Sequence, residues 1–274
     1  MWENRIINGF GYRFSYSNVG ANYNPGVGFE QRFNFSQFGD QLFYSWFAPE
    51  ESSLRQTTIT LNGSVSLNNS SNQLETYLVG LASSWIWNKN AQLTIGFEDF
   101  FDDVPKEFNL SDDIKITPGA YSNISGSVEY STPAVNFIKL EMIGKIGSFY
   151  DGDLSSISIA PEIVFSKYFQ LATFYQFTHI DFKDMNKKFR SHLARLNMAT
   201  SINVKLSASA FVQFNTLDEI SAINFRLRYA PVDGNDLYFV YNEILNTNPM
   251  SEIPHLPPSD NRAILLKYIH TFKL

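Results

Sequence analysis

The four histidines are the side chains in this sequence best suited to acid–base or metal chemistry. They are His179, His192, His255 and His270, and they fall on different predicted strands and in one loop. No two of them have the spacing of a His-x-x-x-His zinc motif, and the chain has no cysteine to complete such a site. We interpret them as surface or channel-facing residues, and we predict no metal site and no cofactor.

Ser191 and His192 are adjacent, which raises the question of a nucleophile and its base. Neighbouring side chains in a strand point to opposite faces, so these two cannot form such a pair with each other. No Gly-x-Ser-x-Gly nucleophile elbow occurs either. We therefore predict a protein that is not an enzyme. A hydrolase remains a minor alternative. It would need a Ser/His or Asp/His pair whose side chains converge at one end of the strands.

Acidic residues gather in and around the longest internal polar stretch. They are Glu98, Asp99, Asp102, Asp103, Asp112 and Asp113. Carboxylates are ligands that calcium prefers, but the spacing does not match an EF-hand loop. We interpret the cluster as a solvated external loop. Two alternatives are a calcium site and a site where divalent ions bridge lipopolysaccharide.

The elements that must position these groups are strands, because apolar and polar residues alternate along most of the chain. Between Ile223 and Tyr229, for example, apolar side chains alternate with Asn224, Arg226 and Arg228. Aromatic residues make up 16% of the chain, yet the mean hydropathy is slightly negative at -0.18. No apolar run approaches the roughly 20 residues that a transmembrane helix needs. The net charge of -6 argues against nucleic acid as a partner.

The pattern predicts an all-β fold, an antiparallel up-and-down transmembrane β-barrel of about fourteen or fifteen strands in one domain over residues 1–274. The predicted strands are 5–16, 27–37, 40–48, 56–67, 73–87, 91–101, 118–131, 136–148, 153–166, 168–180, 188–200, 203–214, 219–230, 236–246 and 262–273. Their lengths suit tilted membrane strands of about 9–11 residues. Single-chain bacterial barrels have an even number of strands, so fifteen indicates either one miscounted early strand or a portion of a larger barrel.

The connections are expected to alternate between short periplasmic turns and longer external loops. The short ones are 88–90, 166–167 and 232–235, and the long ones are 102–119, 181–188 and 246–261. This alternation places the C-terminus in the periplasm. The polar stretch from Ser17 to Gly26 is long on the side where turns should be short, and the alternation does not account for it.

Charged side chains on the polar faces of the strands are expected to face the lumen, because on the lipid face each would cost about 2–4 kcal/mol near the midplane. They are Glu30, Arg32, Glu129, Lys139, Glu141, Lys145, Arg226, Arg228 and Lys267. The mixture of signs suits cross-lumen ion pairs and a selective pore equally well.

The last predicted strand resembles the terminal strand that the outer-membrane insertion machinery recognises. Its signal residues are Leu266, Tyr268, Phe272 and Leu274, which share one face. Two features depart from the usual pattern: the chain ends on Leu274 where Phe is commonest, and His270 lies on the outward face.

Several ordered segments resemble one bacterial outer-membrane family that is catalogued as a domain of unknown function. The segments are 22–29, 117–121, 149–152 and the run from Phe211 to Glu243, and the resemblance covers nearly the whole chain. Intact members begin with a signal peptide and a family-9-type carbohydrate-binding module, and a long β-barrel follows. This chain resembles only the C-terminal third or so, and residues Met1 to Arg5 do not begin a signal peptide. We therefore expect a fragment or a shortened branch of the family.

The resemblance implies a bacterial outer-membrane protein without an established reaction, so no catalytic residues transfer. The expected partners are outer-membrane lipid, lipopolysaccharide and the insertion machinery. The resemblance implies carbohydrate as a further partner. In intact relatives the barrel would anchor the carbohydrate-binding module or pass a solute or polypeptide. The alternative from a different class is a soluble secreted β-rich domain, whose aromatic faces would form a sheet-on-sheet core and a sugar-stacking surface.

Overall fold

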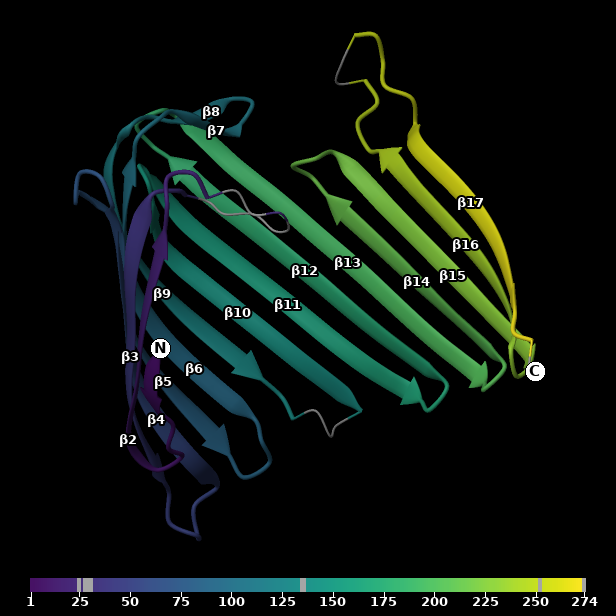
Figure 1. Ribbon diagram of the computed structural model, residues 1–274, viewed down its shortest axis with the longest axis horizontal. Coiled ribbons are helices and arrows are strands. Elements are labelled where there is room, and N and C mark those ends of the chain that lie inside the picture. Colours follow the sequence, from purple (N-terminus) through teal and green to yellow (C-terminus); the bar gives the residue numbers. More distant parts are fainter. Residues whose placement is uncertain (24–25, 27–31, 134–136, 251–252, 273–274) are drawn as a thin grey trace. The chain divides into compact units, whose positions relative to one another are not determined.

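The computed structural model describes residues 1–23, 26, 32–133, 137–250 and 253–272. All regular structure in these residues is β-strand (Figure 1). Fifteen strands form one sheet, in which neighbours follow the order of the chain from β1 to β17, and β7 and β8 form a separate two-stranded sheet. Every pairing recorded in detail is antiparallel and joins strands that follow one another in this order.

The strands have the following bounds: β1 Trp2–Asn4, β2 Gly9–Val19, β3 Phe35–Phe47, β4 Leu54–Asn68, β5 Leu74–Trp87, β6 Gln92–Val104, β7 Phe108–Ser111, β8 Ile114–Ile116, β9 Gly119–Ser131, β10 Ile138–Phe149, β11 Gly152–Ser166, β12 Phe169–Phe182, β13 Lys187–Asn203, β14 Leu206–Asn215, β15 Ile220–Val232, β16 Asn235–Asn246 and β17 Ser259–His270.

The predicted all-β class is confirmed: the described residues form an antiparallel up-and-down sheet whose neighbours follow the order of the chain. That this sheet belongs to a transmembrane barrel remains a prediction. The large sheet has fifteen strands, and without the three-residue β1 it has fourteen long ones, within the predicted range. Most long strands have 12–15 residues, enough for the roughly 9–11 that a tilted membrane crossing needs. Within the described residues, no helix is long and apolar enough to span a membrane.

The prediction was wrong before residue 54, where strands 27–37 and 40–48 were expected as a pair. The structure has the single strand β3 from Phe35 to Phe47, and residues 27–31 lie outside the described residues. Phe38 and Gly39, expected at a turn, pair with Tyr16 and Ser15 in the middle of the β2–β3 ladder. The first predicted strand, 5–16, is also shifted, because β2 runs from Gly9 to Val19.

Merging these two strands accounts for the long loop that did not fit the expected alternation. Successive strands alternate in direction, so every second connection lies at the same end of the sheet. With β3 counted as one strand, the β2–β3 connection (20–34) and the β6–β9 connection (105–118) lie at the same end. The latter is not a bare loop, since it contains the β7–β8 hairpin. The expected long loop at 181–188 is also wrong, because only residues 183–186 separate β12 from β13.

The chain divides into two compact units. The first comprises Met1–Ser131, Ile143–Ser155 and Ile180–Phe189, and the second comprises Thr132–Met142, Ser156–His179 and Arg190–Leu274.

In the first unit, the register of β2 to β9 sorts the side chains onto two contrasting faces. We call one the apolar face; its members include Phe14, Phe38, Leu61, Leu81, Phe97 and Val128. We call the other the polar face; its members include Gln41, Asn62, Ser64, Thr76, Glu98, Asn123 and Glu129. The six side chains named for the apolar face are exposed; Phe97, for example, retains 63% of its accessible surface.

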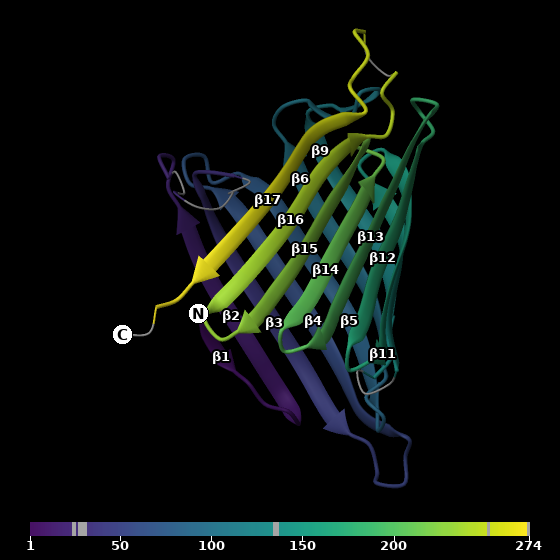
Figure 2. The same cartoon turned by 90° about the vertical axis from the view of Figure 1, so that its right-hand side faces the viewer.

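The second unit repeats this division along β13 to β17, which follow one another in the sheet (Figure 2). Its apolar face carries side chains that include Leu196, Val212, Phe225, Leu227, Phe239, Ile264 and Leu266. Its polar face carries Asn197, Ser209, Asn224, Arg226 and Asn242, among others. The faces that the sequence predicted between Ile223 and Tyr229 are confirmed by this register.

Buried apolar packing is confined to one end of the first unit. Ile114 and Ile116 of β8 pack with Ile180, Phe182 and Phe189 of β12 and β13. Partly buried rings and Leu side chains from β7 and from β9 to β11 surround them. The hairpin is therefore attached to the ends of the strands by a small hydrophobic core (Figure 1). Among the described residues, 45 large apolar side chains are exposed and seven are buried, so the sheet has no core of ordinary size.

Candidate functional site

The polar face of the second unit carries a group of cations at one end of β15 and β17. Arg226 and Arg228 lie two residues apart on β15, and Lys267 on β17 shares a register row with Arg228 through Tyr238. We call these three cations the basic face. All three were predicted to share the polar face, and the register places them there. That this face lines a lumen remains a prediction.

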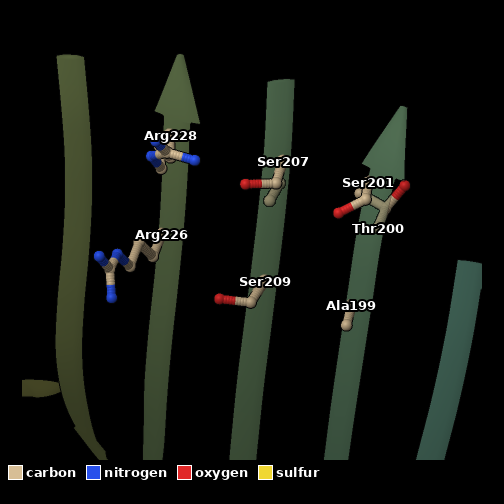
Figure 3. A pocket seen from close by; sticks show the side chains of 8 residues that line it. Ala199, Thr200, Ser201, Ser207, Ser209, Arg226 and Arg228 are labelled. Atoms are coloured by element: carbon tan, nitrogen blue, oxygen red, sulfur yellow. The ribbon is translucent and has the colours of Figure 1, made fainter. Parts of the chain in front are cut away.

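Two shallow hollows border Arg226. The first, about 290 Å³, is lined by both arginines together with residues of β13 and β14 that include Ser201, Ser207 and Ser209. In Figure 3 the hydroxyls of Ser207 and Ser209 point towards the strand that carries the arginines. The second, about 430 Å³, is lined by Arg226, Lys267, Asn224 and Tyr238, among others. Arg226 therefore faces one hollow with hydroxyls and another with an amide and a phenol ring.

The charges of the basic face are only partly neutralised. Oδ1 of Asp236 accepts a hydrogen bond of 2.8 Å from Nε of Arg228 and lies 2.7 Å from its Nη2 in an ion pair. The guanidinium of Arg226 lies 5.0 Å from the centre of the Tyr238 ring, a cation–π contact that leaves its N–H groups free to donate. Neither Arg226 nor Lys267 forms an ion pair within the described part of the chain.

The remaining charged residues of the predicted lumen set behave differently from one another. Lys139 and Glu141 form an ion pair of 2.7 Å along β10. Lys145 lies 3.4 Å from Glu98, a residue of the polar face, and Glu129 lies on that face as well. Such ion pairs can stabilise the arrangement of the strands that carry them. Glu30 lies outside the described residues.

Arg32 was expected within a strand, but it precedes β3 and joins a buried polar network instead. Its guanidinium donates to the carboxylate of Asp102 and lies 3.9 Å from Glu75. The phenol of Tyr150 donates to the other Asp102 oxygen at 3.0 Å. The Tyr150 ring also packs edge-on against Tyr121, at 5.0 Å, and so connects the network to the hydrophobic cluster. The network thus ties the 20–34 connection to β6 and to the β10–β11 turn.

Tyr150 has a perturbed acidity because of this position. Its pKa is raised to about 12, chiefly by burial and further by the hydrogen bond to Asp102 and the negative charge of that carboxylate. Tyr150 lies in a turn with a φ of 51°, a left-handed conformation that is uncommon outside glycine. The sequence did not connect Tyr150 or Glu75 with Arg32 and Asp102, because only the fold brings these distant segments together.

The residues predicted as a terminal insertion signal are placed only in part. Leu266 and Tyr268 lie on the apolar face of β17 opposite Phe239 and Leu237. Phe272 follows the end of the strand at His270 and retains 81% of its accessible surface, so the expectation that it belongs to the strand was wrong. Leu274 lies outside the described residues. The role of these residues in insertion remains a prediction.

The other chemically suggestive residues do not converge. Glu98 and Asp102 lie on the polar face of β6, whereas Asp99 and Asp103 lie on the apolar face. Asp99 accepts hydrogen bonds from Tyr77 and Ser122, each of 3.0 Å. No group of three or more His, Cys, Asp or Glu side chains among the described residues is arranged to hold a metal ion.

The histidines likewise form no catalytic arrangement with serine in the contacts recorded for the described residues. Nδ1 of His192 lies 2.9 Å from the Tyr175 hydroxyl. His179 stacks on Phe177, with ring centres 6.4 Å apart. His270 contacts Phe272 edge-on at 4.5 Å. Each of these three histidines therefore contacts at least one aromatic ring.

No family model and no curated protein matches the chain. Among solved structures, it is similar to a mutant of the ferric enterobactin receptor PfeA from Pseudomonas aeruginosa, with a TM-score of 0.44 and 9% sequence identity. That similarity covers 89% of this chain and 49% of the receptor, so the chain spans about half the length of that receptor. A structure from work on the asymmetric conductivity of engineered proteins has a TM-score of 0.28 and 9% identity, covering 97% of this chain and 99% of that one. Neither likeness assigns a role to this chain.

Proposed function

We propose that this chain forms wall strands of a β-barrel in a bacterial outer membrane. The observation that carries the proposal is the pair of contrasting faces, in which exposed rings and aliphatic side chains cover one face of each unit. Each square ångström of apolar surface left in water costs about 25 cal/mol, so a face with this many exposed apolar side chains favours an apolar medium. Lipid supplies that medium, and a barrel wall presents its apolar face to it.

The soluble alternative, a secreted sugar-binding domain, requires a second sheet to cover the apolar face. In a sandwich, two sheets pack face to face and bury these side chains between them. Apart from the large sheet, the described residues form only the two-stranded β7–β8 sheet. The exposed fractions of Leu81, 52%, and of Ile264, 65%, are therefore hard to reconcile with a soluble sandwich.

Within this proposal the barrel is non-enzymatic, and it anchors a module or passes a solute or polypeptide in a carbohydrate-handling envelope system. Support for the carbohydrate setting comes from the family resemblance of the ordered segments. The expected partners are outer-membrane lipid, lipopolysaccharide and the insertion machinery. A strand such as β17, with Leu266 and Tyr268 outward and Lys267 opposite, has the alternation that this machinery recognises.

Fractionation of cells that express the protein containing this chain tests the proposal. We expect recovery in the outer-membrane fraction, extraction only with detergent, and faster gel migration before boiling than after it. Recovery in the aqueous phase without detergent would favour the soluble alternative.

Passage of solutes is tested separately by planar-bilayer recording of the same protein. Stable conductance steps would support a passage, whereas a folded, membrane-inserted protein without conductance would support the anchoring role. Fractionation and conductance therefore separate the location of the protein from its task.

A further inference from the structure

We propose that the basic face binds small solutes that carry an oxyanion group, a carboxylate or a phosphate. This inference rests on the proposed function, because it names the solute class for the polar face of the barrel wall. The site is centred on Arg226, with Arg228 and Lys267 beside it and the two hollows on either side.

The charge of this face is the first reason. Along β13 to β17 the polar face carries four cations, Arg195, Arg226, Arg228 and Lys267, and a single carboxylate, Asp236. The whole chain has a net charge of -6, so this excess of positive charge runs against the composition. At the paired positions of β2 to β9 the same kind of face carries one cation, Arg13, and three carboxylates, Glu98, Asp102 and Glu129. Arg32, which contacts Asp102, and Glu75, which lies beside Arg32, add one charge of each sign. The positive charge is therefore local to the second unit.

The hydrogen-bonding groups around Arg226 are the second reason. An arginine presents a planar fork of N–H donors that matches a carboxylate or phosphate, and its charge strengthens each hydrogen bond. Ser207 and Ser209 point hydroxyls towards β15 in the first hollow (Figure 3), and Asn224 adds an amide to the second. Tyr238 holds the Arg226 guanidinium by its ring face. The donor set therefore suits oxygen-rich anions, and its hydroxyls and amide also suit the hydroxyls of a sugar.

The dimensions of the site are the third reason. Volumes of about 290 Å³ and 430 Å³ lie at the lower end of ligand pockets, which span roughly 300–1,000 Å³. Both hollows are open, and Arg226 and Lys267 are exposed. A small solute such as a sugar acid or sugar phosphate fits these dimensions. Because the cations are solvated, we expect weak binding that exchanges rapidly, which is what a passage requires.

Binding to the full chain refolded in uncharged detergent micelles tests the inference. Isothermal titration with glucuronate, glucose 6-phosphate and neutral glucose compares the two anion types with an uncharged sugar of similar size. We expect at least one of the anions to bind more tightly than glucose by about tenfold or more, as the strength of charge-assisted hydrogen bonds implies. The preferred anion then identifies the group, carboxylate or phosphate. Added salt should weaken this binding.

Three variants locate the site. Arg226→Gln should lower the anion affinity about tenfold, and Lys267→Gln should lower it by a smaller factor, because Lys267 lines only one hollow. Arg195→Gln is the matched control: it removes a cation from the same face, but Arg195 is engaged with Gln213 at 3.0 Å and lines neither hollow. This control should bind as tightly as the unmodified chain.

Two results would overturn the inference. One is equal binding of glucose and both anions, and the other is an equal effect of Arg226→Gln and Arg195→Gln. Circular dichroism and heat-modifiable gel migration, measured on the same samples, confirm that each variant is folded. If the protein is folded and inserted in the membrane but binds no anion, only this inference fails. If it binds anions but fractionates as a soluble protein, only the proposed function is contradicted.

Discussion

Gly147 illustrates how a single residue sets the spacing of two strands. A Cβ atom at this position would lie 2.2 Å from the carbonyl oxygen of Ile124 on β9, and 2.5 Å from Cα of Ser125. Next to it, the hydroxyl of Ser148 accepts a hydrogen bond from the N–H of Ile124 at 2.8 Å. Any side chain at residue 147 must therefore displace backbone, and only glycine permits the observed approach.

We predict that Gly147→Ala lowers the free energy of unfolding by about 1–3 kcal/mol, the usual cost of an atom forced into a packed site. The matched control is Gly144→Ala in the same strand, where a Cβ would meet nothing within 4 Å. Urea unfolding of both variants in micelles measures the difference. Equal midpoints for the two variants would show that the strands do not approach each other as described.

The ionisation of the Tyr150 phenol leads to a second prediction. Its pKa of about 12 exceeds the ordinary value of 10.0 chiefly because of burial, and then because of Asp102. A raised pKa means that the folded chain favours the neutral phenol, so the stabilisation is complete below about pH 10. It is lost as the pH rises from about 10 through about 12.

The absorbance of phenolate, measured against pH, tests this directly. The difference between the unmodified chain and Tyr150→Phe should correspond to a phenol that ionises near pH 12. Asp102→Asn should move that ionisation to lower pH, because it removes the negative charge beside the phenol. If Tyr150→Phe instead removes a group that ionises near 10, Tyr150 is not held in the network with Asp102.

At the scale of elements, alternation predicted most strands but failed where its phase changes. In β3 the apolar side chains Phe38, Leu42 and Tyr44 share the apolar face, whereas Phe35 and Phe43 lie on the polar face. The change of phase between Phe35 and Phe38, next to Gly39, resembles a turn in the sequence. In the structure, Gly39 instead allows a close approach of the Ser15 side chain, whose oxygen would lie 2.7 Å from an added Cβ.

The β7–β8 hairpin was missed for a different reason. Its strands have four and three residues, too few for alternation to be recognised. Their packing depends on distant residues, since the cluster that contains Ile114 and Ile116 also contains Ile180, Phe182 and Phe189. In the same way, the faces of Arg226, Arg228 and Lys267 follow from alternation alone, but Ser207, Ser209 and Asp236 join them only through the register of four strands.

Adjacent residues of β17 allow the two faces to be compared directly. Leu266 lies on the apolar face and Leu265 on the polar face, and both are exposed, at 69% and 55%. In a membrane, Leu266→Arg should destabilise the protein by up to about 2–4 kcal/mol, depending on its depth, because it places a charge in lipid. Leu265→Arg should have an effect near zero, because the polar face is wet.

Urea unfolding from lipid vesicles measures both substitutions of β17. A soluble domain would give a different result, since two exposed leucines in water tolerate arginine equally. Equal stabilities of Leu266→Arg and Leu265→Arg would therefore contradict the assignment of the apolar face to lipid.

At the scale of the whole molecule, the sequence was sufficient to predict an all-β antiparallel sheet, because period-two alternation recurs in nearly every long strand. It was insufficient to predict how charge is distributed between the units. The polar face of β2 to β9 carries an excess of carboxylates, whereas that of β13 to β17 carries an excess of cations. Net charge and composition average over both units, and alternation gives only the face of each cation, so the register is needed to show that the three cations lie close together.

If the chain forms a barrel wall, one face of the sheet contacts lipid and the other contacts water. The chain has no cysteine, so single cysteines can be introduced along β6 and labelled with nitroxide without removing any native thiol. Collision with oxygen, which dissolves in lipid, and with a water-soluble nickel complex then reports the surroundings of each position in vesicles. We predict that positions 93, 95, 97, 99 and 101 collide mainly with oxygen, and that 94, 96, 98, 100 and 102 collide mainly with nickel. Equal access of the nickel complex to both sets would contradict the account.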